Sequence, residues 1–320
     1  MQPKLKKRLK FIIPLLIGFF FVFISLYRFE AEERQLIWSN IKQANLFWVS
    51  VSVVLGICSH LSRAYRWQFL LQPLGVKPRF INSFFSVMFA YLANLGVPRS
   101  GEVLRGATLA NYEDVKFEQA FGTIITERVI DFLMLLLIVG VTILYQADLI
   151  LNFFENKSIN PLFTLIVLGV LILLILFGIK LFSRSQQPII LKVKQFLEGV
   201  VQGMKTVLKM KNSLLFILHT FLIWALYIAM FVVVKYSISG TTDVHLSVLL
   251  VAFVFGSFAM SITNGGIGIY PLTIGATIAG FGGDAVAGES FGWIVWTAQT
   301  LLVIVVGGFS ALLMPIVNKD

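Results

Sequence analysis

The sequence predicts an all-α integral membrane protein, a polytopic helical bundle with about six full spans and two re-entrant or broken hairpins. Hydrophobic residues make up 58% of the 320 residues and charged residues only 13%, whereas ordinary globular chains carry about 25% charged residues. Several apolar runs approach the roughly 20 residues that cross a bilayer as a helix. The distribution of Lys and Arg among the loops then orients these runs. We expect residues 1–320 to form a single transmembrane domain.

The full spans are predicted from apolar runs of sufficient length, at 11–27, 46–62, 124–145, 161–182, 213–236 and 290–316. Five basic residues lie within the first ten, which predicts a cytoplasmic N-terminus. The run 11–27 resembles a signal peptide, but the bulky, charged stretch 28–33 offers no small-residue cleavage site. We therefore expect an uncleaved first transmembrane helix. The stretch after the second span, with Arg63, Arg66, Lys77 and Arg79, is expected on the cytoplasmic side.

Two shorter apolar regions do not fit simple spans. The basic loops place both ends of 80–96 on the cytoplasmic side, so this segment and the helix after it are predicted to form a re-entrant hairpin. The alternative is that the charge rule misplaces one loop. Segments 246–262 and 271–283 flank a Gly-rich break and form a second such pair, entering from the outside. Interrupted segments entering from opposite faces are typical of inverted-repeat transporters, whose sites lie near the midplane.

The formal net charge of +10 has a membrane explanation rather than a nucleic-acid one. The sequence contains no zinc-finger, RNP or basic-zipper pattern, so no nucleic-acid partner is expected. In 186–211, apolar residues at helical spacing alternate with lysines, which predicts a cytoplasmic amphipathic helix on the membrane surface. Its role is either to bind anionic lipid or to orient the chain.

Two groups of charged residues lie in or beside apolar segments, where charge is costly and usually faces a cavity or a partner. In the first group, Glu127 and Asp131 share a helix face, and Arg128 can pair with Asp131. This group has an unmatched negative charge, which an external cation or another arginine, Arg99 or Arg105, should balance.

The second group follows Pro98, which suits the first turn of a helix. Arg99, Glu102 and Arg105 are then expected to stack along one face. A helix N-terminus beside arginines favours an anion, and Arg binds phosphate through two parallel hydrogen bonds. The two groups together therefore predict either a lipid-headgroup site or an internal salt-bridge network. The headgroup site would comprise Arg99, Glu102, Arg105, Glu127, Arg128 and Asp131.

Five residues are assigned to the backbone of the hairpins rather than to binding. They are Pro98, Gly101, Gly265, Gly266 and Gly268. The glycines after Asn264 lack the strand–turn–helix context of a nucleotide-binding loop and are expected to permit an unwound backbone or close helix approach.

No catalytic residue, metal site or cofactor is predicted. The three histidines, His60, His219 and His245, are far apart in sequence and lack metal-ligand spacing, so we expect packed or interfacial roles. Cys58 is the sole cysteine and lies in an apolar run, which excludes an intramolecular disulfide.

Three motifs resemble the lysylphosphatidylglycerol synthetase transmembrane-domain family, over nearly the whole chain. They are P-R-S-G-E-V-L-R, T-E-R-V-I-D and N-G-G-I-G. The family includes the membrane half of the bacterial multiple peptide resistance factor, which moves aminoacylated phosphatidylglycerol to the outer leaflet. The third motif departs from the family, which often has a glutamate where this chain has Ile269, Tyr270 and Pro271. Two-domain members also carry a soluble aminoacyl-transferase domain that this sequence does not show, so we expect no lipid synthesis by that route.

The resemblance and the charged groups together imply a flippase or transporter for a phospholipid or another phosphate-bearing lipid. Membrane phospholipids are therefore the expected partners, with a homo-oligomer or a lipid-modifying enzyme as further possible partners. Two alternatives remain open at this stage. An intramembrane transferase acting on a lipid carrier could use Glu102, Glu127 or Asp131 as general acid or base. An auxiliary subunit of a lipid-modifying enzyme is the other.

Overall fold

The computed structural model describes residues 16–25, 27–97, 99–145, 207 and 210–319, and every regular element within them is helical. Four helices are long and apolar enough to cross a membrane: α3 (Leu46–Leu71, continued by the 3₁₀ turn η1, Gln72–Leu74), α6 (Phe117–Tyr145), α10 (Ser213–Val232, continued by η2, Val233–Ser237) and α13 (Ala285–Val317). They coincide with four of the six predicted spans. The first predicted span is described from Leu16, as the short apolar helix Leu16–Ser25.

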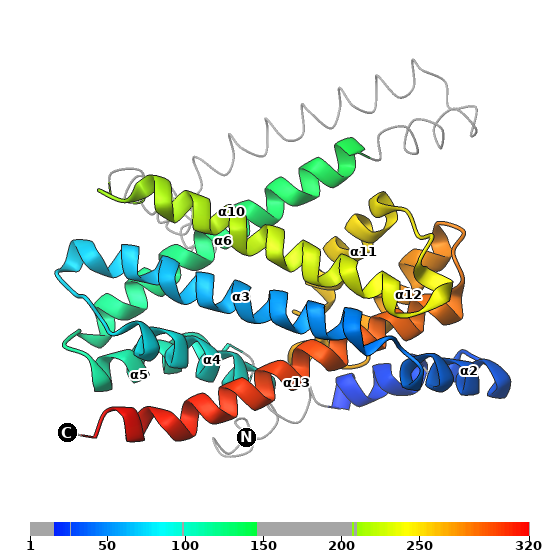
Figure 1. Ribbon diagram of the computed structural model, residues 1–320, viewed down its shortest axis with the longest axis horizontal. Coiled ribbons are helices and arrows are strands. Elements are labelled where there is room, and N and C mark those ends of the chain that lie inside the picture. The colour runs from blue at the N-terminus through cyan, green and yellow to red at the C-terminus, as the bar shows by residue number, and fades with distance from the viewer. Residues whose placement is uncertain (1–15, 26, 98, 146–206, 208–209, 320) are drawn as a thin grey trace, which may run out of the picture.

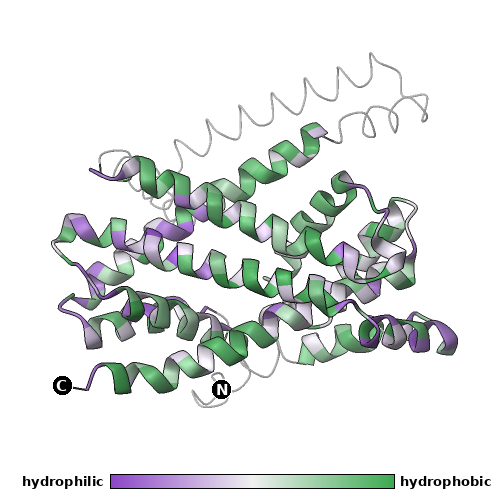
Figure 2. Ribbon diagram, viewed as in Figure 1, coloured by the Kyte–Doolittle hydropathy of each residue, from purple (hydrophilic) through white to green (hydrophobic). Residues whose placement is uncertain are grey.

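The remaining helices are shorter. They are α2 (Ala31–Lys42), α4 (Phe80–Gly96), α5 (Gly101–Tyr112), η3 (Ser239–Thr241), α11 (Leu246–Ala259), η4 (Asn264–Gly266) and α12 (Ile269–Gly280). Figure 2 shows hydrophobic residues along the long helices and polar residues at their ends. The all-helical membrane class predicted from composition is therefore confirmed. The predicted span 161–182 and nearly all of the predicted amphipathic helix 186–211 lie outside the described residues.

The described helices form two units with the same order of lengths. Each unit has a long helix, two short helices and a second long helix: α3–α4–α5–α6 and α10–α11–α12–α13. The units run in opposite directions in Figure 1, where α3 and α13 run from right to left while α6 and α10 run from left to right. One apolar core lies mainly within the first unit, around Trp67 and Ile124, and another mainly within the second, around Phe231 and Phe291. This is the inverted arrangement that the two broken segments predicted.

The first hairpin is held together at its turn by small and polar residues. The backbone N–H of Gly101 donates to Asn94 Oδ1 over 2.7 Å, and Ser100 Oγ donates to the carbonyl of Val97 over 2.7 Å. A Cβ on Gly101 would collide with the carbonyl oxygen of Ala90, so α4 and α5 pack this closely only because residue 101 is glycine. The predicted re-entrant pair is therefore present as two short, adjoining helices.

The second hairpin turns through glycines with left-handed backbone. Gly265, Gly266 and Gly268 have φ angles of 61°, 75° and 73°, which glycine adopts without steric cost. The indole N–H of Trp296, on α13, donates to the carbonyl of Gly265 over 2.7 Å and fixes the turn. The predicted unwound backbone is confirmed at these three positions.

The tips of the two hairpins meet inside the bundle. A Cβ placed on Gly265 would lie 2.7 Å from Leu95 Cδ2, at the end of α4. A Cβ placed on Gly268 would lie 2.3 Å from the backbone nitrogen of Val22, in the helix Leu16–Ser25. The turn 264–268 thus contacts both the first hairpin and the first helix.

Candidate functional site

A cluster of buried charges lies among α3, α4, α5, α6 and α10, beside the first hairpin. Its centre is the carboxylate of Glu127, on α6, which is fully buried. Arg66 Nη2 lies 2.8 Å from Glu127 Oε1, and Arg105 Nη1 lies 2.7 Å from Glu127 Oε2. Arg63 Nη1 approaches Oε1 at 3.4 Å. Three arginines from two helices therefore surround one carboxylate in the transmembrane region.

Asp131, one turn further along α6, binds two of the same arginines. Arg63 Nη1 donates to Asp131 Oδ2 over 2.5 Å, and Arg66 Nη2 donates to Oδ1 over 2.9 Å. Glu127 and Asp131 are four residues apart, so both carboxylates project from one face of α6 toward α3. The negative charge of this face was predicted to be balanced by an external cation or by another arginine, and the structure shows arginines there, Arg105 among them.

Polar residues of α10 complete the environment of the α3 arginines. Arg66 Nη1 donates to Thr220 Oγ1 over 3.0 Å, and Arg63 Nε donates to the Tyr227 hydroxyl over 3.3 Å. The Tyr227 hydroxyl lies 3.3 Å from the hydroxyl of Tyr91, on α4. Arg63 and Arg66 are thus paired with carboxylates and hydrogen-bonded to neighbouring helices, which offsets the cost of burying them.

The prediction that Arg63 and Arg66 lie in a cytoplasmic stretch after the second span is wrong. Helix α3 continues to Leu71, and the two residues are only 2% and 0% exposed. The carboxylates of α6 pair with both arginines, which offsets the cost of burying their charges within the helix bundle. The sequence did contain a signal for a longer helix. Arg63 and Arg66 are three residues apart, which puts them on one helix face, and a mostly apolar stretch follows them to Leu71.

Arg105, on α5, is buried against an aromatic ring. Its guanidinium carbon lies 3.9 Å from the centre of the Trp67 ring, and only 2% of the residue is exposed. The Trp67 indole N–H donates to Thr123 Oγ1 over 2.8 Å, which fixes the ring. Despite the short contact with Glu127, none of the three side-chain nitrogens of Arg105 makes a well-directed hydrogen bond to any described residue. Arg105 Nε and Nη2 therefore have no acceptor among the described residues, whereas Nη1 is paired with the Glu127 carboxylate.

Glu102 and Arg128 form a longer ion pair at the edge of the cluster. Arg128 Nε lies 3.8 Å from Glu102 Oε1, with 42% and 26% of the two side chains exposed. Arg128 was expected to pair with Asp131; within the described residues its ion pair is with Glu102 instead. Arg63 and Arg66 of α3 occupy both oxygens of Asp131, and Arg128 pairs with Glu102 of α5.

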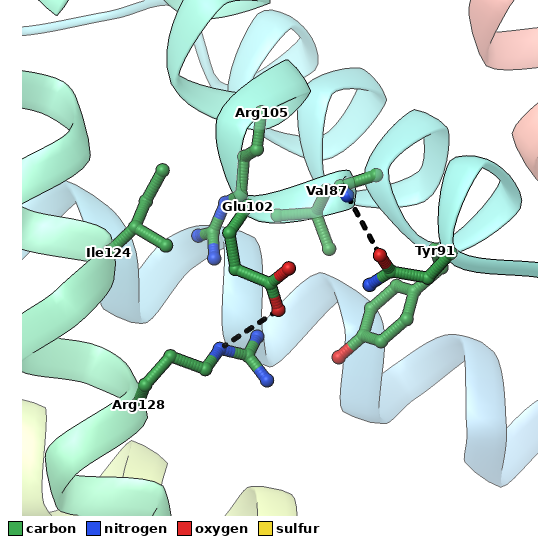
Figure 3. A pocket seen from close by; sticks show the side chains of 9 residues that line it. Val87, Tyr91, Glu102, Arg105, Ile124 and Arg128 are labelled. Carbon is green, nitrogen blue, oxygen red and sulfur yellow. Dashed lines mark hydrogen bonds and ion pairs between the residues drawn. The ribbon is translucent and has the colours of Figure 1, made fainter. Parts of the chain in front are cut away.

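Nine residues of α4, α5 and α6 line a small, partly open pocket between Arg105 and the Glu102–Arg128 pair, with a volume of about 10 Å³, enough for roughly one water molecule. Figure 3 shows the side chains of Glu102, Arg105 and Arg128 converging on this space, with the Tyr91 ring at its edge. Asn94 and Gly101 line it from the hairpin turn.

Arg99 and Pro98 do not take the predicted positions in a helix. Helix α5 begins at Gly101, and Arg99 lies before it with a left-handed φ of 63° and an exposed side chain. The predicted stack along one helix face therefore holds for Glu102 and Arg105 but not for Arg99. Pro98 lies outside the described residues.

A second buried carboxylate, Glu289 on α13, was not among the predicted site residues. Arg28 Nη2 lies 2.7 Å from Glu289 Oε2, and Ser25 Oγ donates to Oε1. Gly275 on α12 leaves room for the carboxylate, since a Cβ there would lie 2.6 Å from Glu289 Oε2. This pair joins the first helix to the second unit. Glu289 directly precedes the predicted span 290–316, so hydropathy alone did not indicate that it is buried.

The histidines take part in packing and capping. The His60 ring packs against the Tyr91 ring at a tilt of 45°, with ring centres 4.8 Å apart, and His219 Nδ1 lies 2.8 Å from the hydroxyl of Ser62. His245 caps the start of α11 by accepting from the backbone N–H of Ser247. Within the described part of the chain, no group of three or more His, Cys, Asp or Glu side chains is arranged to hold a metal ion.

Comparison with known proteins gives two matches. The sequence model of the family described as lysylphosphatidylglycerol synthase TM region matches residues 11–311. A membrane protein of Methanocaldococcus jannaschii with the family designation UPF0104 is 27% identical over 122 residues. That match covers 37% of this chain and about a third (35%) of the relative's length. No solved structure shows significant similarity to the chain.

Proposed function

Because the chain belongs to the lysylphosphatidylglycerol synthase TM-region family, we propose that it moves a phosphate-bearing lipid between the two leaflets of its membrane. Family membership indicates a multi-pass membrane protein that handles lipid. Movement of the lipid between leaflets goes beyond family membership and is our proposal. The membrane is proposed to be the bacterial cytoplasmic membrane, with the N-terminus on the cytoplasmic side, because the first ten residues carry five basic residues.

The observation that carries the proposal is the state of Arg105. Arg105 is only 2% exposed; its Nη1 contacts Glu127, but its Nε and Nη2 have no acceptor among the described residues, and such donors are costly to leave unpaired in a membrane interior. A phosphate group would accept from them, since Arg binds phosphate through two parallel hydrogen bonds. A small, partly open pocket adjoins these donors, and Asn94 and Gly101 of the hairpin turn line it.

The charge of the whole cluster also supports a bound anion. Arg63, Arg66, Arg105 and Arg128 contribute four positive charges, while Glu102, Glu127 and Asp131 contribute three negative charges. The cluster therefore has one excess positive charge. An unmatched charge is expensive within a bilayer, so a monovalent anion would stabilise the site.

The inverted arrangement of the two units supports a transport function over a purely structural one. Inverted repeats allow one unit to move against the other, so that a central site opens to each side in turn. The hairpin tips, which meet at Leu95 and Gly265, provide a contact at which this movement could occur. The lipid is proposed to leave chemically unchanged, so lipids recovered from the assay below should have their original mass.

The test uses purified protein in vesicles that contain lipids labelled on an acyl chain, with bleaching of the outer-leaflet label by a membrane-impermeant reductant. Wild-type protein should make the inner-leaflet label accessible over time. Arg105→Ala should abolish this movement while retaining the wild-type elution profile in detergent. Arg79→Ala is the matched control, because Arg79 is 54% exposed and lies at the end of the bundle beside Asn318. Equal movement in wild type and Arg105→Ala would contradict the proposal.

A further inference from the structure

Glu289 is a buried carboxylate of the second unit that has no part in the lipid site proposed above. Its side chain is fully buried on α13, whereas Arg28, which follows the first helix, keeps a 30% exposed side chain. Arg28 Nη2 donates to Glu289 Oε2 over 2.7 Å, and Ser25 Oγ donates to Oε1. Both carboxylate oxygens are therefore bound by residues at the end of the first helix.

The helices around Glu289 leave its charge to Arg28. Within the described residues, Arg28 is its one ion-pair partner, and the charged residues of α2 form no ion pair with it. On α12, Gly275 faces the carboxylate, since a Cβ there would lie 2.6 Å from Glu289 Oε2. Tyr270, the titratable residue of α12, packs its ring against Gly256 of α11 instead. The state of Glu289 therefore depends on one arginine whose side chain is in reach of water.

The first helix also packs against the turn of the second hairpin. An added Cβ on Gly18 would collide with the side chain of Ile267, and one on Gly268 would collide with the backbone at Val22. A shift of this turn therefore displaces the helix Leu16–Ser25. The contacts with Glu289 fasten that helix to α13, so they also hold the second hairpin in place.

Detaching the first helix from α13 would leave the Glu289 carboxylate buried without a counter-charge. An ionised carboxylate without a partner is very costly in a low-dielectric interior, so the group becomes neutral by taking up a proton. Arg28 has no comparable cost, because its side chain already reaches polar surroundings. Release of the helix and protonation of Glu289 are therefore linked.

We infer that Glu289 is a proton-binding site of the transporter, and that its protonation releases the first helix so that the second hairpin can move. One proton from water adds to a carboxylate oxygen, which removes the negative charge and with it the ion pair to Arg28. In the ionised state this ion pair holds the helix against α13. The inference rests on the proposed function, since it specifies the event that permits the two units to move.

The test repeats the vesicle assay at a series of pH values between about 5 and 9, equal on both sides of the membrane. The labelled lipid is a phosphodiester that keeps its charge over this range, and every sample returns to one common pH before the outer-leaflet label is bleached. Wild-type movement should slow as the pH rises, approaching about tenfold per pH unit, because only the protonated fraction of Glu289 permits movement.

Glu289→Gln removes the titration while keeping the shape of the side chain. The amide is neutral at every pH, so movement should be independent of pH and at least as fast at high pH as wild type is at low pH. Glu113→Gln is the matched control, because Glu113 is also paired with an arginine, Arg79, and its side chain is only 14% exposed. Glu113 lies beside Asn82 on α4, away from the first helix, and its variant should keep the wild-type pH profile.

Arg28→Ala separates a proton site from a purely structural ion pair. Without Arg28, Glu289 has no ion-pair partner among the described residues and takes up its proton at higher pH. Fast movement should therefore extend upward by at least about one pH unit. A structural ion pair predicts slower or unchanged movement at every pH, and that result would overturn the inference. This variant keeps Glu289, so it still decides if Glu289→Gln does not fold.

The remaining outcomes separate the inference from the proposed function. A rate independent of pH in wild type, or the wild-type pH profile in Glu289→Gln, overturns the inference and leaves the proposed function standing. Incubation with a bulky organic cation in place of sodium, at one pH, tests the other small cation that could neutralise the carboxylate. Loss of movement without sodium overturns the assignment to a proton. If the lipid moves at no pH, the proposed function fails as well.

Discussion

The Arg105 guanidinium carbon lies 3.9 Å from the centre of the Trp67 ring, so α3 supplies the surface on which the key arginine of α5 rests. Trp67 is fully buried and is itself held by the hydroxyl of Thr123 on α6. Three helices therefore fix the position of one guanidinium. The aromatic face attracts the cation without using its N–H groups, so Nε and Nη2 remain available to a ligand while Nη1 contacts Glu127.

Trp67→Leu should reduce lipid movement because it removes this aromatic surface while remaining apolar. A desolvated cation–π contact is worth about 2 kcal/mol, which corresponds to a roughly 30-fold loss of affinity for the headgroup. The measurement is the rate of lipid movement as a function of labelled lipid concentration. Trp67→Phe keeps a ring beneath Arg105 and should retain most of the activity. Equal rates in the Leu and Phe variants would show that the stack has no functional role.

The two buried glutamates should differ in their importance for stability. Glu127→Gln leaves Arg63, Arg66 and Arg105 with one carboxylate fewer in a fully buried site, and breaking such a cluster costs about 3–5 kcal/mol. Glu289→Gln should cost less, because its partner Arg28 has a 30% exposed side chain and can reach polar surroundings. Thermal unfolding in one detergent should therefore show a larger drop for Glu127→Gln. A larger drop for Glu289→Gln would contradict this ranking.

Gly268→Ala should destabilise the protein through the backbone. Gly268 has a left-handed φ of 73°, and a Cβ there would collide with backbone atoms of the helix Leu16–Ser25. The strained backbone alone costs about 1–3 kcal/mol. Gly280→Ala is the matched control, since no atom lies within 4 Å of its added Cβ, and its effect should stay within about 1 kcal/mol. The two melting temperatures, measured side by side, check the prediction. Equal values would show that this turn does not need glycine.

The sequence predicts the fold better than the site because hydropathy is a property of segments. The apolar runs and loop charges identified the spans that correspond to α3, α6, α10 and α13, and also both hairpins. Which side chains pair between helices depends on tertiary packing, and a local sequence pattern carries no information about that packing. The rule that basic residues mark the cytoplasmic side therefore misplaced Arg63 and Arg66, because their charges are neutralised by carboxylates more than 60 residues away.

Within the site, residues that share one helix were predicted more accurately than pairs between helices. Glu127 and Asp131 project together because four residues make about one helical turn. The position of Arg99 was wrong because α5 begins two residues after it, at a boundary that depends on the contact between Gly101 and Asn94. Such boundaries follow from tertiary packing, so a sequence pattern locates them poorly.

The opposed directions of the two units predict the labelling pattern of single cysteines. Asp114, between α5 and α6, and Asp243, between α10 and α11, are exposed and lie in turns at opposite ends of the bundle. In a Cys58→Ser background, which removes the sole native thiol, Asp114→Cys and Asp243→Cys should react with a membrane-impermeant thiol reagent from opposite sides. The basic N-terminus predicts that position 114 is labelled from the cytoplasmic side and position 243 from the other side. Labelling after permeabilisation is the control and should reach both positions. Labelling of both from one side would contradict the inverted arrangement, and with it the route by which a lipid bound at Arg105 would reach both leaflets.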